Sequence, residues 1–317
     1  MSLRLDPDLA KVIAALPPMP RSNVNDVSEL REVTNTILGT IFGARPAVPG
    51  VSETTIHFTS RDGTRLPIYK FTPANTTHDT SKPQPAIIFV HAGGMVSGKV
   101  AFFRNVITKY AASTGTIIYA VEYRLAPECP FPGPIHDVYD ALEWLHQHAV
   151  DEGVDPARIG IWGESAGGGI AAGVVLMARD KSLSPPIAKQ VLIYPMLDER
   201  TVLGPEHPLN PFLGWTSWYN TLGWNAYLGA DRTDISPYAS PARATNLSEL
   251  PRTYIDVGGL DLFRDEDIAY AARLAAANVD VEFHLYAGVP HGWEGVAPDI
   301  PVSKRAEQNR IAALSDL

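Results

Sequence analysis

Cysteine is nearly absent from this sequence of 317 residues, which contains only Cys129. A single thiol cannot form an internal disulfide, and it cannot build a zinc site alone. Basic residues are also few, because 26 Lys and Arg stand against 35 Asp and Glu, giving a formal charge of −9. Since there is no basic run either, this charge balance argues against nucleic acid or an anionic membrane surface as a partner.

Long hydrophobic runs are missing as well, and no stretch approaches the roughly 18 apolar residues that span a bilayer. The N-terminal segment carries Asp6 and Asp8, and its apolar stretch 12–16 is too short for the core of a secretory signal. We therefore expect a reduced, cytoplasmic protein without stable membrane insertion. Repeats and low-complexity tracts are absent too, and the prolines and glycines are spread along the chain without forming a linker. We therefore expect a single domain over residues 1–317.

The spacing of apolar residues predicts an α/β fold. Apolar runs of strand length, typical of a parallel sheet covered on both faces, occur at 86–91, 116–121, 158–162, 190–194 and 253–257. A later strand, 281–286, is expected to be half exposed. Helical patterns alternate with these runs at 102–112, 135–148, 168–179, 265–277 and 302–314. The alternation indicates a doubly wound, mostly parallel sheet flanked by helices.

Three segments lie outside this alternation. Residues 54–60 and 65–71 alternate around a turn at 61–63 and predict a β-hairpin. Residues 1–45 have helical spacing, and the aromatic-rich segment 199–230 predicts an inserted helical piece over the sheet edge. We expect these last two segments to form a helical cap, in which tryptophans more commonly pack than contact substrate.

The sharpest motif is Gly-Glu-Ser-Ala-Gly at 163–167, which directly follows a predicted strand and directly precedes a predicted helix. In this context a G-x-S-x-G sequence forms a tight turn that strains the central serine and lifts its hydroxyl above the sheet. Ser165 is therefore the candidate nucleophile. Taken alone, the pattern also fits a chance match in which the serine is only a helix N-cap.

A second motif, His-Ala-Gly-Gly-Met at 91–95, follows the first buried strand. Glycines after a strand can direct backbone N–H groups toward one point, as an oxyanion hole requires. We expect the N–H groups of Gly93, Gly94 and Ala166 to be these donors. A tight glycine turn with no ligand is the alternative for this segment by itself.

A nucleophilic serine needs a base, and the base needs an orienting carboxylate. His291 is the candidate base among the nine histidines, because its loop follows the last predicted strand. Asp261 lies just after the strand 253–257 and is the candidate carboxylate. The chain order Ser165, Asp261, His291 is the order expected of G-x-S-x-G enzymes with this architecture.

Further motifs occur in the same order and carry a family resemblance. They are Tyr-Arg-Leu-Ala-Pro-Glu at 123–128, Phe-Pro at 131–132 with Asp137, Tyr-Pro at 194–195 with Asp198, and Asp-Leu-Phe-Arg-Asp-Glu at 261–266. From about His91 to Trp293 the sequence resembles the α/β-hydrolase fold, specifically the hormone-sensitive-lipase-like esterases of the bacterial family IV type.

This resemblance implies that Ser165, Asp261 and His291 form a catalytic triad and that the N-terminal helices cap the acyl pocket. It also implies that Glu128 supports the region of the turn at 163–167, which is called the elbow below. The sequence departs from the family at Ala92, where relatives usually have glycine, which predicts an altered loop that keeps its donor glycines. The elbow carries Glu164 where relatives often have aspartate, which predicts different local hydrogen bonding.

These features predict a serine carboxylesterase for short- to medium-chain esters, working through an acyl-enzyme without metal or cofactor. Met95, Trp215 and Trp293 are the candidate substrate contacts, because they suit a compact apolar pocket. A lactonase, an amidase or an acyltransferase would use the same nucleophile. A non-catalytic receptor of this fold is disfavoured, since the related plant gibberellin receptors lack the histidine that His291 supplies. Edge pairing through strand 281–286 would favour a homodimer.

Overall fold

One mixed sheet organises the chain. The computed structural model describes residues 3–16, 24–43, 45–46, 48–74, 76, 82–229 and 232–317. Its strands are β1 (Val51–Thr59), β2 (Arg65–Pro73), β3 (Gln84–Val90), β4 (Ile117–Val121), β5 (Val154–Glu164), β6 (Lys189–Ile193), β7 (Arg252–Gly258) and β8 (Val281–Tyr286). They lie in the order β1-β2-β4-β3-β5-β6-β7-β8, with β1–β2 and β2–β4 antiparallel and the other neighbours parallel. The predicted α/β sheet and the predicted hairpin are confirmed.

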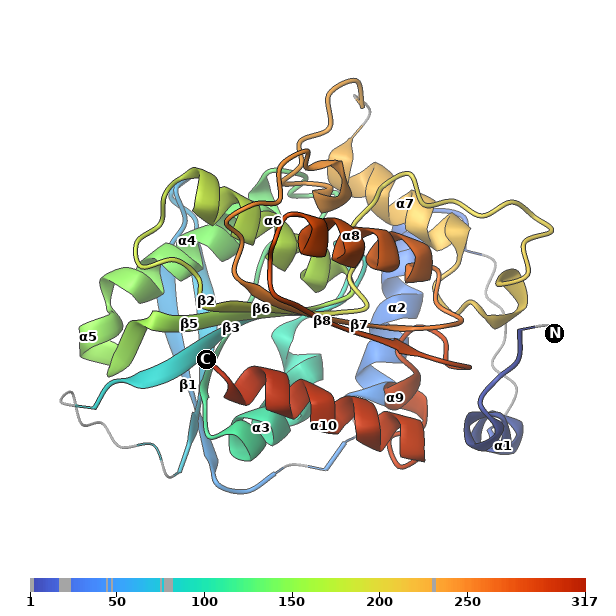
Figure 1. Cartoon of the computed structure of the whole chain (residues 1–317), viewed down its shortest axis with the longest axis horizontal. Helices are drawn as coiled ribbons and strands as arrows, with labels where there is room; N and C mark the ends of the chain where they lie inside the picture. The colour runs from blue at the N-terminus through green and yellow to red at the C-terminus, as the bar shows by residue number, and fades with distance from the viewer. Residues whose placement is uncertain are drawn as a thin grey trace.

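Helices cover both faces of this sheet (Figure 1). One face carries α3 (Val100–Thr114) and α10 (Pro301–Ser315), and the other carries α4 (Gly133–Gln147), α6 (Ala166–Asp180) and α8 (Arg264–Ala276). Two short helices, α5 (Ala149–Glu152) and α9 (Trp293–Val296), precede β5 and α10. In the described part of the chain, no helix is both long and apolar enough to cross a membrane.

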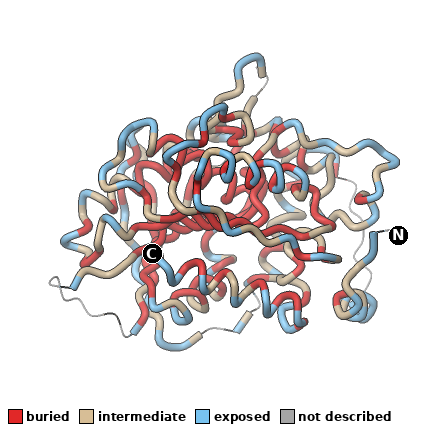
Figure 2. The backbone as a smooth tube through the Cα atoms, in the orientation of Figure 1, coloured by how far each residue is buried: buried red, intermediate tan, exposed pale blue. Residues whose placement is uncertain are grey.

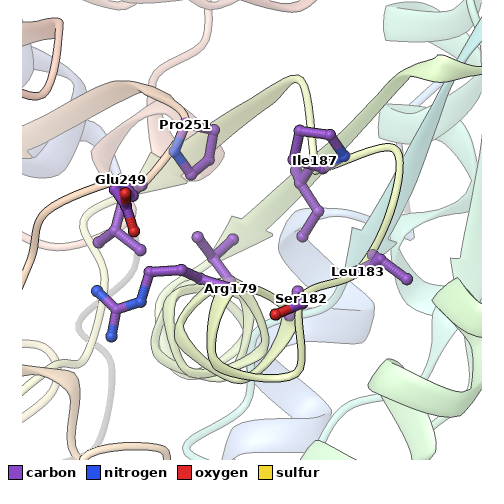
Figure 3. Close-up of a pocket in the computed structure, with 10 residues that line it drawn as sticks. Arg179, Ser182, Leu183, Ile187, Glu249 and Pro251 are labelled. Atoms are coloured by element: carbon purple, nitrogen blue, oxygen red, sulfur yellow. The ribbon is translucent and has the colours of Figure 1, made fainter.

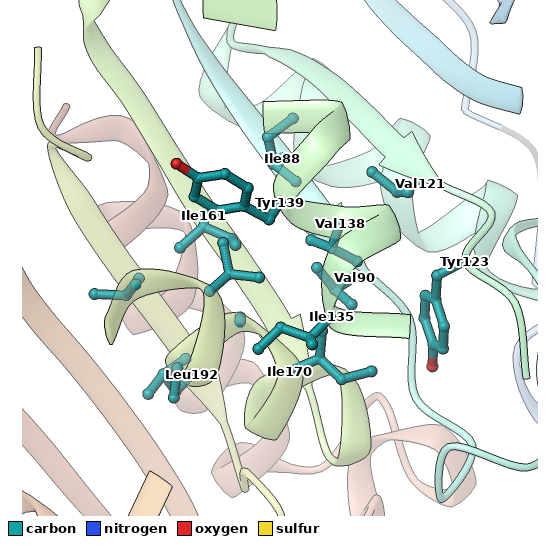
Figure 4. Close-up of a cluster of buried hydrophobic side chains, with 14 of the residues drawn as sticks. Ile88, Val90, Val121, Tyr123, Ile135, Val138, Tyr139, Ile161, Ile170 and Leu192 are labelled. Carbon is teal, nitrogen blue, oxygen red and sulfur yellow. The ribbon is translucent and has the colours of Figure 1, made fainter. Parts of the chain in front are cut away.

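The central strands are buried on both faces, which gives the molecule two apolar layers (Figure 2). Strand β3 shows how the sequence produces them, because successive side chains of a strand point to opposite faces. Ile88 and Val90 pack with side chains of α4 and α6 in one cluster (Figure 4). Ile87 and Phe89 belong to the second cluster, with side chains of α3 and α10. An unbroken apolar run is therefore what this position in the sheet requires.

The two segments expected to form a cap contribute α1 (Pro7–Ala15), α2 (Val27–Ile41) and α7 (Ser217–Leu228). Helices α2 and α7 pack together, and Trp218 Nε1 donates a 2.7 Å hydrogen bond to the Val24 carbonyl. Helix α1 lies instead against α9. The inserted segment is less helical than predicted, since before α7 it has only a single 3₁₀ turn, Asn210–Phe212. Residue 230 and residues 1–2, 17–23 and 44 of the expected cap lie outside the described residues.

Candidate active site

A sharp turn joins β5 to α6 and carries Ser165. The serine has φ 55° and ψ −119°, a conformation that side chains rarely adopt. Glycine is required on both sides, because a Cβ atom at Gly163 or at Gly167 would lie 2.2 Å from a backbone oxygen. The strand–turn–helix context predicted for this motif is therefore present, with the serine at the carboxyl end of the parallel strands.

The three candidate residues for acid–base and nucleophilic chemistry form one hydrogen-bonded row. His291 Nε2 lies 2.9 Å from Ser165 Oγ, and its Nδ1 lies 2.7 Å from Asp261 Oδ2. Because an ionised carboxylate only accepts hydrogen bonds, Nδ1 donates to Asp261 and Nε2 accepts from the Ser165 hydroxyl. The other Asp261 oxygen accepts from the Phe263 N–H at 3.0 Å.

The three side chains of this row are largely shielded from solvent. Asp261 is fully buried, Ser165 is 6% exposed, and the His291 side chain is 16% exposed. Tyr194 and Phe263 hold the His291 ring edge-on, with ring centroids 4.5 Å and 5.2 Å away. Electrostatic interactions among the three groups are stronger here than they would be in water.

The glycine loop, residues 93–98, runs beside this row and has an unusual backbone. Gly93, Gly94 and Met95 all have positive φ, at 136°, 61° and 64°. Within the residues that the structure describes, the N–H groups of Gly93, Gly94 and Ala166 donate to no protein acceptor. Ala92 is not among the described residues with positive φ, so its methyl group needs no special conformation. The loop thus keeps two unused donors despite the missing glycine, and Ala166 at the start of α6 adds a third.

The profile of the alpha/beta hydrolase fold family matches residues 87–295. Esterase LipI of Mycobacterium tuberculosis is 33% identical over 313 residues, covering 98% of this chain and 94% of LipI. The chain belongs to the α/β-hydrolase family. Carboxylesterase NlhH of Mycobacterium tuberculosis is 34% identical over 238 residues, which is 73% of each chain.

The structure of a bacterial heroin esterase superposes on this hydrolase with a TM-score of 0.86. The two are 37% identical, and the match covers 98% of this chain and 97% of the other. The relatives and structural neighbours are esterases of the hormone-sensitive-lipase-like group, which confirms the resemblance drawn from the motifs.

The candidate substrate contacts of this hydrolase have different surroundings. Trp215 covers the glycine loop, since a Cβ atom at Gly94 would lie 2.3 Å from Trp215 Cη2. Met95 is fully buried and Trp293 is 1% exposed, packed between Tyr194 and Tyr286. Trp215 is the one of the three that is partly exposed, and substrate contact by the enclosed Met95 and Trp293 stays a prediction.

The other family motifs make structural contacts. Glu128 does not support the elbow, as the resemblance implied, but pairs with Arg31 on α2, which lowers the pKa of Glu128 to about 2. Asp137 is buried and pairs with Arg124. Glu266 accepts hydrogen bonds from the N–H groups of Leu197 and Asp198, in the loop after β6. These motifs therefore brace the loops around the site.

A buried ionic network behind the site was missed by the sequence analysis. Arg310 on α10 donates to both oxygens of Asp256, at 2.7 Å and 3.0 Å, and to Glu294 at 2.7 Å. Tyr194, whose ring touches His291, also donates to Glu294, at 2.6 Å. The available signal was an arginine on the apolar stripe of a helix, since α10 buries Arg310 together with neighbouring apolar residues.

Glu164, next to the candidate nucleophile, lies close to this network. It is 4% exposed and forms no ion pair within the described ranges. Burial raises its pKa to about 8, and the charges of Glu294 and Asp256 add to the effect while Arg310 opposes it. The Glu164 carboxyl is therefore protonated near neutral pH.

A cavity of about 330 Å³ opens at the opposite end of α6 from Ser165 (Figure 3). Apolar side chains line most of it, together with Arg179 and Glu249. Arg179 Nη1 is already bonded at 3.0 Å to the carbonyls of Asn246 and Ser248. No candidate site residue lines this cavity, so it is separate from the site described above.

Proposed function

We propose that this chain is a serine carboxylesterase that cleaves short- to medium-chain carboxylic esters through an acyl-enzyme. The observation that carries the proposal is the double contact of His291, which meets Ser165 with one ring nitrogen and Asp261 with the other. The unused donors of the glycine loop and the elbow support it, because acyl transfer needs both a nucleophile and a place for the oxyanion.

The proposed reaction begins when Ser165 Oγ attacks the ester carbonyl carbon and its proton passes to His291 Nε2. Asp261 holds the imidazole by Nδ1 and stabilises the imidazolium that forms. The carbonyl oxygen becomes an oxyanion that accepts from the N–H groups of Gly93, Gly94 and Ala166. Each such donor is typically worth about 2.7–4 kcal/mol of transition-state stabilisation.

The tetrahedral intermediate then collapses, and His291 returns the proton to the leaving alkoxide, which departs as the alcohol. A water molecule attacks the acyl-enzyme while His291 accepts its proton. The second collapse frees the carboxylic acid and returns the proton to Ser165. No metal or cofactor enters this sequence of steps.

The preference for short acyl groups rests on the position of Trp215. Its ring packs against Gly94 and its Nε1 donates to Asn220 at 3.2 Å, which fixes it beside the proposed oxyanion hole. A bulky, anchored side chain at this point limits the space beside the reacting carbonyl. Esterase names among the relatives favour ester hydrolysis over amide hydrolysis or acyl transfer.

The test is hydrolysis of p-nitrophenyl esters from acetate to palmitate by this protein and by Ser165→Ala. We expect turnover to peak at short chains and to be abolished in the variant. Adding excess alcohol or amine acceptor distinguishes an acyltransferase, which would form new ester or amide at the expense of acid. Absence of turnover at every chain length, from folded protein, would contradict the esterase assignment.

A further inference from the structure

Helix α2 forms hydrogen bonds to the glycine loop at two positions. Arg31 and Asn35 lie four residues apart, one turn along the same helix face. Arg31 binds the loop at Val96, and Asn35 binds it at Gly98. Both contacts end on the loop's backbone, and the loop carries the candidate oxyanion donors.

Arg31 makes the larger contact. Its Nε donates to the Val96 carbonyl at 2.6 Å, and its Nη2 donates to the Ala126 carbonyl, also at 2.6 Å. Glu128 completes the arrangement by accepting from Nη1 at 2.8 Å and from Nη2 at 2.6 Å. Because Ala126 N–H donates to the Met95 carbonyl at 2.9 Å, the guanidinium ties together two loops that are already joined.

Asn35 secures the far end, where its Oδ1 accepts from the Gly98 N–H at 2.8 Å. The loop also folds on itself, with the Gly93 carbonyl accepting from Ser97 Oγ at 2.7 Å and from Ser97 N–H at 2.9 Å. Of the three successive positive φ angles, two fall on glycines, and the strained residue is Met95 at φ 64°. Such strain persists only where the surroundings over-determine it. The contacts from α2 supply part of that constraint.

The loop is also contacted by the second cap segment, residues 199–229. Trp215 packs on Gly94, and Gly223 of α7 also lies against the Gly94 carbonyl. The bond from Trp218 to Val24 in turn fixes α7 to the start of α2. The glycine loop is therefore contacted by both cap segments.

We propose that Arg31 and Asn35 are positioning residues for the oxyanion hole, holding the glycine loop so that the N–H groups of Gly93 and Gly94 face the reacting carbonyl. The inference rests on the proposed esterase function. Both side chains bond the backbone of the loop, so the proposed effect is exerted through the loop. In this arrangement the cap takes part in transition-state stabilisation as well as in enclosing the acyl group.

The experiment compares Asn35→Leu with two matched variants. Asn35→Asp keeps an oxygen that can accept from Gly98, and Thr36→Leu makes the same apolar change one residue along α2, where the threonine is exposed and bonds only its own helix at Glu32. Arg31→Met, which keeps the aliphatic stem, tests the other anchor. Each is assayed with p-nitrophenyl acetate and with a short-chain trifluoromethyl ketone, which adds reversibly to the serine and places an oxyanion in the hole.

We expect Asn35→Leu and Arg31→Met to lower kcat by about tenfold or more, since a small misplacement of catalytic groups can cost up to about 10²-fold. KM should hardly change, and the inhibition constant of the trifluoromethyl ketone should rise in proportion to the loss of kcat. Asn35→Asp should restore most of the turnover, and Thr36→Leu should behave as the parent protein.

A normal kcat in both Asn35→Leu and Arg31→Met would overturn the proposal, and so would a rise in KM alone, which would assign α2 to substrate binding. Hydrogen exchange of the peptide covering residues 92–99 separates this question from the esterase assignment. Faster exchange there in Asn35→Leu than in Thr36→Leu is expected whether or not the tested esters are substrates. Unchanged exchange would refute the anchoring itself.

Discussion

Replacing Glu164 by glutamine should stabilise the protein increasingly as the pH rises. The carboxyl has its pKa raised by burial from 4.5 to about 8, so the folded protein retains a proton that the unfolded chain releases above about pH 4.5. Folding stability therefore falls between these two pH values, by at most about 1.4 kcal/mol per pH unit. Above pH 8 the accumulated cost is roughly 3–5 kcal/mol. Glutamine has nearly the same shape and no proton to lose, so it avoids this cost.

Urea denaturation at about pH 5.5 and about pH 8.5 measures the effect directly. The free energy of unfolding of Glu164→Gln should exceed that of the parent by about 2–4 kcal/mol more at the higher pH than at the lower one. Glu206→Gln serves as the control, because Glu206 is exposed and its replacement makes the same change from carboxyl to amide. If the advantage of Glu164→Gln were equal at the two pH values, the carboxyl would not be held protonated by burial.

Three other substitutions test the site and its supports. Asp261→Asn should leave substrate binding intact but lower kcat by about 10⁴-fold, because the imidazole would no longer be held in the reactive tautomer; steady-state kinetics with p-nitrophenyl acetate measure it. Arg310→Met should destabilise the fold by about 3–5 kcal/mol in urea denaturation, since the fully buried Asp256 loses its cation. Gly94→Ala should lower turnover sharply, because its methyl group would lie 2.3 Å from Trp215 Cη2 at φ 61°. Adding Trp215→Ala should restore part of that activity by removing the clash.

Each of these three predictions can be contradicted by a specific result. Asp261→Asn with unchanged kcat would remove Asp261 from the proposed triad. An equal loss of stability on replacing exposed Arg305 by methionine would show that the buried pair is not the cause of the Arg310 effect. If Gly94→Ala combined with Trp215→Ala were no more active than Gly94→Ala alone, backbone strain would explain the lost turnover without the clash.

Local patterns were sufficient to predict the sheet, the hairpin and the row of Ser165, Asp261 and His291. Each of these residues lies just after a strand, and the carboxyl ends of β5, β7 and β8 meet at one edge of the sheet. Strand position in the sequence therefore translates directly into spatial proximity at the site. The family match added the expectation of an esterase, which the comparisons support.

The contacts that could not be predicted join residues with no periodic relation. Arg31 and Glu128 are 97 residues apart, and Arg310 and Asp256 are 54 apart. The direction of the Trp293 side chain could not be predicted either, because closeness in sequence to His291 does not determine which way a side chain points. The loop after β8 turns, so the indole packs into the core while the imidazole faces Ser165.

Helix α2 packs on the rest of the domain through few buried residues, and this predicts how activity responds to heating. Leu30 and Leu38 are the buried residues of that helix, whereas the central strands are almost entirely enclosed. Segments with few buried contacts open locally at a lower free-energy cost than the whole domain. If α2 also holds the glycine loop, warming should abolish catalytic activity at temperatures where the sheet is still folded. Activity lost in that interval should return on cooling, because the core has never come apart.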